Sequence, residues 1–198
     1  MKVGCIAGAA ALVIALIVGA VLAGRYNGLV SLDEKTQAAW SEVDNQYKRR
    51  YDLIPQLVAT VQGAANFERS TLEAVTEARA SVGRAQLPPG LPSDPARLES
   101  YMEAQQGLSA ALGRLFAVVE SYPELKANQN YLSLQDQLEG TENRIAVARR
   151  DFIDSVRGYN TYLRRFPTNL VAGLFGFDAR PQLEIDEAER EAPKVAFE

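Results

Sequence analysis

The sequence has 198 residues, a hydrophobic fraction of 47% and a formal net charge of −4. This length suits one domain of ordinary size together with a membrane anchor. The absence of histidine removes the commonest general base and metal ligand, and the single cysteine, Cys5, excludes an internal disulfide. Residues 178–198 carry the whole net charge, so the rest of the chain lacks the basic stripe that nucleic-acid binding needs. We therefore expect no nucleic-acid partner, no metal and no cofactor.

The N-terminal segment predicts a membrane anchor. Val3–Gly24 has no charged side chain and is bracketed by Lys2 and Arg25. At about 1.5 Å per residue, a helix of this length spans about 30 Å, the thickness of a bilayer core. A cleavable signal peptide is the competing interpretation, but the apolar run exceeds the roughly 7–15 residues usual for one. We expect a retained single-pass anchor over residues 1–25, in contact with membrane lipid. The flanking charges do not determine which side of the membrane holds the rest of the chain.

Small residues recur every fourth position along this anchor, which predicts a self-association face. Small side chains at this spacing let two helix backbones approach closely in lipid. Alanine and glycine are also common throughout the segment, so a stripe without function stays an open alternative. The residues of the candidate face are Gly4, Ala7, Gly8, Ala11, Ala15, Gly19 and Ala23.

Beyond the anchor, apolar residues step by three or four, which predicts a long helix from about Leu29 to Ile54. Pro55 cannot donate a hydrogen bond to the carbonyl of Tyr51, so we expect a kink there or a new helix capped by Asp52. The helical pattern then resumes from Leu57 to Val82.

The segment Gln86–Pro95 holds four prolines and a glycine and predicts a loop, with Ser93 or Asp94 capping the next helix. That helix shows the apolar pattern from Leu98 to Tyr122 and stops at Pro123. A last long helix ends at Phe166-Pro167. It carries apolar residues at the seven-residue spacing of a coiled coil: Leu138, Ile145, Phe152, Tyr159 and Phe166.

Helices without alternating strands predict an all-α fold: an N-terminal transmembrane helix followed by an antiparallel bundle of three or four helices. We place the bundle at residues 26–177 and an acidic tail at 178–198. The tail also holds apolar residues at its end, so disorder and docking onto the bundle both stay open.

Residues with catalytic chemistry are sparse. Carboxylates such as Glu68, Glu73 and Glu77 lack the histidines of di-iron bundles, and no serine or threonine has a partner base. We expect no enzyme. The first bundle helix carries an aromatic stripe, which favours core packing. It also carries a basic cluster, which favours a solvated face. A partner surface is the alternative for both. The residues concerned are Trp40, Tyr47, Lys48, Arg49, Arg50 and Tyr51.

Several sequence blocks, in order along the chain, resemble the LemA family. They are Tyr26–Val30, Ala39–Val58, Thr71–Ala80, Asn143–Phe152, Tyr159-Asn160, Phe166-Pro167, Phe175–Phe177 and Ala192–Phe197. Phe67 stands where the family often has histidine, and Leu183 where phenylalanine is usual. The resemblance implies a bacterial inner-membrane protein with an antiparallel helical bundle, and it offers no catalytic residues to carry over. Family members resemble a magnetosome protein involved in shaping membrane, and they often lie near membrane metallopeptidases in genomes.

Two functions follow as hypotheses. The first is a non-enzymatic scaffold in which homo-oligomers organise the membrane. The second is an adaptor or regulator of a membrane protease or an envelope-stress pathway. Loss of self-association on enlarging Ala11, Ala15 and Gly19 is expected for the scaffold, whereas an adaptor would co-purify with a different protein.

Overall fold

The computed structural model describes residues 2–64 and 67–183, with the side chains of residues 2–7 and 9 left outside it. This part of the chain is helical and holds no strand. Its helices are α1 (Lys2–Gln62), α2 (Arg69–Arg84), α3 (Pro95–Val119), α4 (Pro123–Lys126), α5 (Gln129–Arg164) and α6 (Thr168–Phe175).

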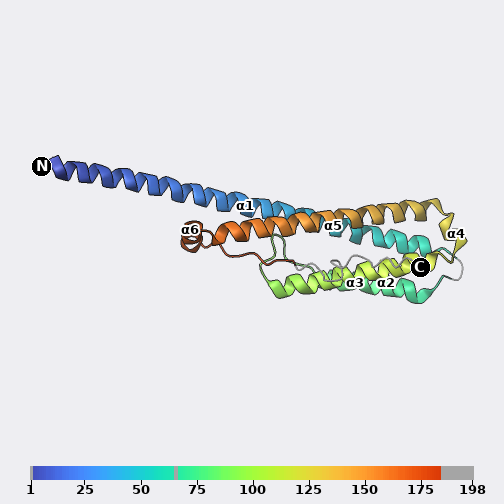
Figure 1. The fold of residues 1–198 in the computed structure, drawn as a ribbon. Helices are drawn as coiled ribbons and strands as arrows, with labels where there is room; N and C mark the ends of the chain where they lie inside the picture. Colours follow the sequence, from blue (N-terminus) through green and yellow to red (C-terminus); the bar gives the residue numbers. More distant parts are fainter. Residues whose placement is uncertain (1, 65–66, 184–198) are drawn as a thin grey trace, which may run out of the picture.

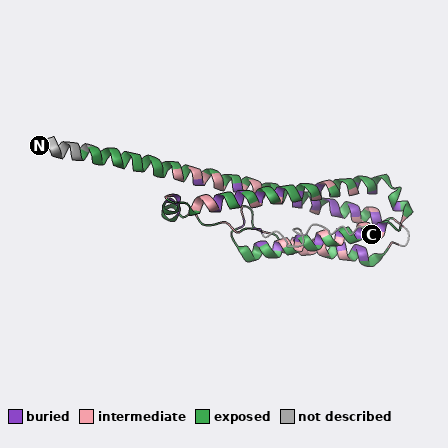
Figure 2. Cartoon of the chain, viewed as in Figure 1, coloured by how far each residue is buried: buried purple, intermediate pink, exposed green. Residues whose placement is uncertain are grey.

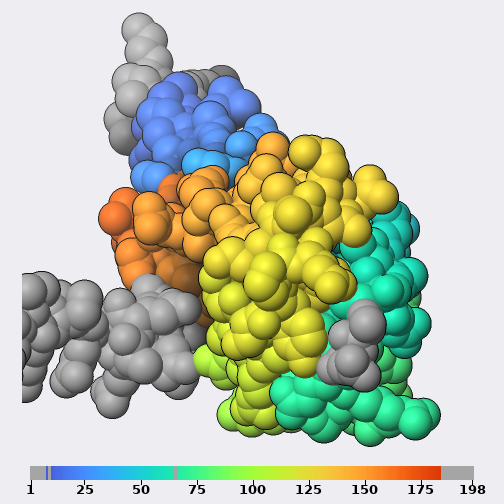
Figure 3. Space-filling model, turned by 90° about the vertical axis from the view of Figure 1, so that its right-hand side faces the viewer, coloured from blue at the N-terminus to red at the C-terminus, as the bar shows by residue number. Residues whose placement is uncertain are grey.

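The four long helices run up and down in chain order, which confirms the predicted antiparallel bundle (Figure 1). Helix α1 packs along α5, and α2 packs along α3. Figure 3 looks onto the end where α3 passes through α4 into α5 (yellow). The N-terminal part of α1 (blue) lies behind this end in the view, because it projects from the opposite end of the bundle (Figure 1).

Helix α1 is one continuous helix of 61 residues that passes through Pro55. At about 1.5 Å per residue it is roughly 90 Å long. The expected restart at Asp52 is therefore wrong. The carbonyl of Tyr51, which Pro55 leaves without its helical donor, accepts a hydrogen bond from Arg79 Nε on α2 at 3.2 Å. The Arg79 guanidinium also stacks over the Tyr51 ring at 3.8 Å. A side chain from the neighbouring helix thus replaces the missing backbone donor.

Capping residues start two of the other long helices. Asp94, one of the two predicted caps, caps α3 by accepting from the amides of Ala96 and Arg97, and Pro95 is the first residue of the helix. Asn128 caps α5 in the same way, through the amides of Asn130 and Tyr131. Helix α3 ends at Val119, slightly before the predicted stop.

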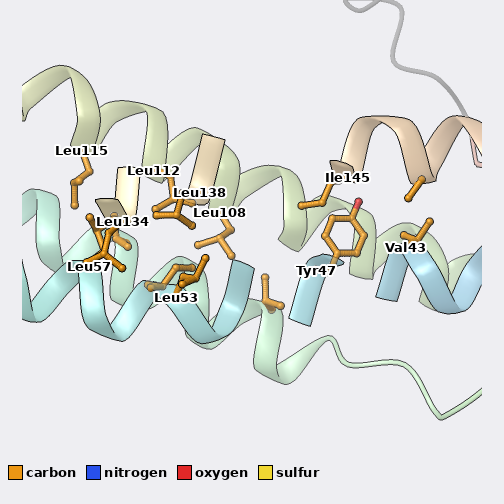
Figure 4. Packing of buried hydrophobic residues seen from close by; sticks show 14 of the residues in the cluster. Val43, Tyr47, Leu53, Leu57, Leu108, Leu112, Leu115, Leu134, Leu138 and Ile145 are labelled. Carbon is orange, nitrogen blue, oxygen red and sulfur yellow. The ribbon is translucent and has the colours of Figure 1, made fainter. Parts of the chain in front are cut away.

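Leucines from three helices meet in the bundle core. Leu53 and Leu57 of α1 point toward Leu108 of α3 and toward Leu134 and Leu138 of α5 (Figure 4). Four members of the seven-residue series on α5 are buried, but the fifth, Phe166, is 79% exposed. The prediction that Phe166 continues the series is wrong, because α5 ends at Arg164 and Phe166 lies beyond it.

The N-terminal third of α1 projects from the bundle (Figure 2). It is long and apolar enough to cross a membrane, and almost all of its apolar window is exposed. Leu12, Ile14 and Leu16 are each more than 60% exposed. This part of the helix therefore has no apolar partner within the described chain.

Candidate functional site: the groove between α3 and α5

Arg50 of α1 is the largest fully buried side chain of the described structure, at 1% exposure. Its Nη1 donates to Ser109 Oγ at 2.6 Å and to Glu142 Oε1 at 2.5 Å. Its Nη2 donates to the carbonyl and the side-chain Oε1 of Gln105, at 3.1 and 2.5 Å. One guanidinium therefore joins α1, α3 and α5 through charge-assisted hydrogen bonds.

The burial of Arg50 depends on this set of acceptors. A charge removed from water is stable only when it is paired and its hydrogen bonds are satisfied. Gln105 is itself buried, whereas Glu142 is 39% exposed and reaches the charge from the rim of the groove. The two terminal nitrogens of Arg50 are satisfied, its Nε is buried without a hydrogen-bond partner, and the ion pair opens toward solvent on its acidic side.

An open groove of about 1360 Å³ lies over this ion pair. Helix α3 lines one side, α5 lines the other, and Tyr47 and Arg50 of α1 form part of its floor. Glu99 and Glu103 stand on the α3 side, and Arg149 and Arg157 on the α5 side. Glu142 also lies on the α5 side, where it is paired with Arg50, so the α3 side is acidic and the α5 lining carries a net positive charge.

The first residues of the acidic tail contribute to the lining of the groove. Arg180 forms a two-pronged ion pair with Asp33 of α1, at 2.8 and 3.0 Å. Asn160 of α5 donates to the Arg180 carbonyl and accepts from its amide, at 2.8 and 2.9 Å. These contacts place Pro181 and Gln182 in the groove lining and bury Leu183 in the core. The residues beyond, 184–198, lie outside the described structure.

Aromatic rings pack beneath the groove. Trp40 lies 5.2 Å from Phe152, and Tyr101 lies 5.8 Å from Tyr47 in an edge-on arrangement, as measured between ring centroids. Burial, with a smaller effect of the Asp44 carboxylate, raises the pKa of Tyr101 to about 12. The Tyr101 phenol therefore ionises only in strongly alkaline solution, in line with its role as a buried packing group.

The six residues considered as a partner surface do not share one face. Trp40 and Tyr47 are buried, in line with the core-packing interpretation. Lys48 and Arg49 are exposed, but the prediction of a solvated face fails for Arg50, which points inward to Gln105 and Glu142. Tyr51 is partly buried against Arg79.

The described members of the small-residue face are all exposed, and nothing lies within 4 Å of a Cβ added at Gly8 or Gly19. They are Gly8, Ala11, Ala15, Gly19 and Ala23. The side chain of Ala7 and the surroundings of Gly4 lie outside the described residues. This face is therefore free of contacts within one chain, and its role in self-association stays a prediction.

Sequence reasoning missed the partners of Arg50. Gln105 occupies a position of the α3 pattern that is otherwise apolar. A polar residue at such a position indicates a buried side chain that requires hydrogen-bond partners. Nothing marked Ser109 or Glu142, because their role depends on how α3 and α5 approach α1. In the described part of the chain, no group of three or more cysteine, aspartate or glutamate residues is arranged to hold a metal ion.

Comparison with known proteins identifies the family. The LemA family model matches residues 39–197, which covers the groove, most of the bundle and nearly all of the tail. The chain belongs to the LemA family. It is similar to "Magnetosome protein MamQ 2" of Paramagnetospirillum magneticum, with 31% identity over 80% of this chain and 64% of that protein. "Magnetosome protein MamQ" of Magnetospirillum gryphiswaldense is 28% identical over 77% of this chain and 62% of its own length.

"Protein LemA" of Metamycoplasma hominis is also similar, with 28% identity over 77% of this chain and 65% of that protein. The chain thus spans just under two thirds of the length of these curated relatives. Arg50, Gln105, Ser109 and Glu142 all fall inside the LemA match, whereas the apolar part of α1 precedes it.

Proposed function

We propose that this LemA-family protein is a non-enzymatic scaffold of the bacterial inner membrane, anchored by α1 and assembled into homo-oligomers. The observation that carries the proposal is the continuity of α1. The same helix is an exposed apolar segment at one end and a core element of the bundle at the other.

The continuity of α1 connects the anchor directly to the bundle. No loop separates the apolar segment from the bundle, so a contact between two anchors also sets the relation between two bundles. Small residues at four-residue spacing allow such a contact in lipid, where close backbone approach takes the place of hydrophobic driving force. The exposure of this face in the single chain leaves it available for a second copy.

Matched alanine variants test the self-association step. Ala11→Leu with Ala15→Leu enlarges the small face, whereas Ala10→Leu with Ala20→Leu makes the same chemical change on the opposite side of the helix. The full-length proteins are cross-linked in membranes with a lipid-permeable reagent. The scaffold predicts oligomers in wild type and in the control pair, and monomers in the small-face pair. Equal cross-linking of both pairs would contradict it.

The groove favours a second candidate, an adaptor that binds a segment of another membrane protein, such as a protease. Its oppositely charged rims suit an extended peptide carrying both signs of charge. A photo-cross-linking residue at Glu103, in the groove lining, is compared with one at Ala110, an exposed position on α3 outside that lining. The adaptor predicts a product with a different protein at position 103 that persists in the small-face variant. Products with copies of this chain alone would count against it.

A further inference from the structure

An apolar patch lies at the end of the bundle next to the anchor. It is formed by α6 and by Phe166, the second residue after the end of α5. Its four large side chains are more than half exposed: Phe166 at 79%, Leu170 at 59%, Leu174 at 77% and Phe175 at 57%. The opposite side of α6 is apolar too, and it buries Val171 and Ala172 against the bundle. Helix α6 therefore has apolar surfaces on two sides, of which one is covered by the described chain.

Aromatic contacts place this patch at the base of the apolar segment. The ring of Phe175 lies 4.9 Å from Tyr26, and that of Phe177 lies 5.7 Å from it. Tyr26 directly follows Arg25, the charged residue that ends the apolar run. One turn further along α1, Leu29 is fully buried among the inner residues of α6. The patch is therefore about one helical turn, or roughly 5 Å, from the end of the apolar segment.

The packing of the bundle fixes α6 next to the end of the apolar segment. Helix α6 packs against both α1 and α5, and α1 passes this level without interruption (Figure 1). Tyr159 of α5 donates a hydrogen bond to the carbonyl of Asp178 at 3.0 Å, which fastens the chain just after α6. When the apolar segment lies in a bilayer, this geometry brings the patch to the lipid–water boundary.

The surroundings of the patch suit that boundary. Arg164 and Arg165 are exposed at the end of α5, next to the patch, and Arg25 stands on α1. Asp178, which follows α6, is an exposed acid, so these four charged residues together carry a net positive charge. Aromatic rings and arginines are the side chains that favour the interface, because their apolar parts enter lipid while their polar ends reach the headgroups.

We propose that α6 is a second membrane-binding element, which lies in the plane of the interface and inserts Leu170, Leu174 and Phe175 among phospholipids. The inference rests on the proposed anchoring through α1. Interfacial helices insert their apolar face about 5–10 Å into the headgroup and acyl boundary. A single spanning helix leaves a protein free to rotate about that helix. A second contact away from the axis fixes which side of the bundle faces the membrane.

Site-specific fluorescence quenching tests the proposal on the full-length protein. After Cys5→Ser, a single cysteine at Leu174 is labelled with an environment-sensitive fluorophore. The protein is reconstituted into vesicles of phosphatidylcholine and phosphatidylglycerol with nitroxide groups at a shallow or a deep acyl position. Val13→Cys, near the middle of the apolar segment and opposite the small-residue face, reports on anchoring. Val147→Cys, exposed on α5 about 26 Å before its C-terminal end, is the soluble control.

The expected result is a depth profile. The probe at 174 is quenched more by the shallow nitroxide, the probe at 13 more by the deep one, and the probe at 147 by neither. Quenching at 13 with none at 174 would overturn the role of α6 while leaving the anchor intact. No quenching at either position would overturn the anchoring itself. A probe at 174 shielded from both lipid nitroxides and aqueous iodide would show that protein covers the patch, which also overturns lipid contact.

Discussion

Removal of Glu142 provides the sharpest test of how the three helices are held together. Glu142→Ala removes the carboxylate that pairs with the buried guanidinium of Arg50 and leaves it the neutral acceptors of Gln105 and Ser109. Breaking a buried ion pair costs about 3–5 kcal/mol. Glu142 is 39% exposed and the groove admits water, which places the expected loss at the lower end, about 3 kcal/mol.

The loss is read as a thermal shift. For a chain of this size, 1 kcal/mol corresponds to about 2–4 °C, so Glu142→Ala should unfold about 6–12 °C below wild type when helicity is followed in mild detergent. Glu77→Ala is the matched control, because it removes the partner of Arg84 from an ion pair exposed on both sides. That control should change stability by less than about 1 kcal/mol.

A second substitution separates the buried charge from the lost contact. In the Glu142→Ala background, Arg50→Met removes the stranded charge and keeps a long apolar stem. The double variant should therefore be less destabilised than the sum of the two single variants by about 1–3 kcal/mol. If Glu142→Ala behaves like the Glu77→Ala control, or if the two effects simply add, the proposed role of the ion pair is refuted.

Three further outcomes are expected, each measured by unfolding of the full chain in detergent. Arg79→Ala strands the carbonyl freed by Pro55 and should cost about 1–3 kcal/mol, a loss that shrinks in a Pro55→Ala background because the new amide supplies the donor. The pKa of Tyr101 is about 12 in the folded protein against 10 in the unfolded chain, so its burial contributes to the free energy of unfolding below pH 10 and this contribution is lost as the pH rises toward 12. Tyr101→Phe should reduce the loss of unfolding free energy over this pH range by roughly 2–3 kcal/mol, and an unchanged loss would refute the reasoning. Gly176 ends α6 at a φ of 74°, so Gly176→Ala should cost about 1–2 kcal/mol, whereas Gly173→Ala, inside α6 with open space around it, should not destabilise.

Local sequence signals predicted most of the fold. The apolar period, the proline-rich loop and the Asp94-Pro95 start of α3 are properties of neighbouring residues, and the structure confirms them. Pro55 was misjudged because a local rule treats the missing amide as a break. The donor that resolves it, Arg79, lies on another helix and becomes visible once α1 and α2 are packed together.

The candidate site was harder to predict from the sequence, because its contacts also form only when the helices pack together. A Lys-Arg-Arg cluster predicts a solvated face, and two of its three residues are indeed exposed. The direction of Arg50 depends on acceptors drawn from α3 and α5, which are more than fifty residues away along the chain. The apolar patch of α6 posed a similar difficulty, since a short apolar segment in a sequence does not reveal which of its sides the bundle covers.

The most direct test of the central claim is the mass of the intact protein in mild detergent, compared with the Ala11→Leu and Ala15→Leu variant and its Ala10→Leu and Ala20→Leu control. The scaffold account predicts a discrete oligomer for wild type and control, and a monomer for the small-face variant with its helicity unchanged. A monomeric wild-type protein, or an oligomer that persists in the small-face variant, would contradict assembly through the anchor.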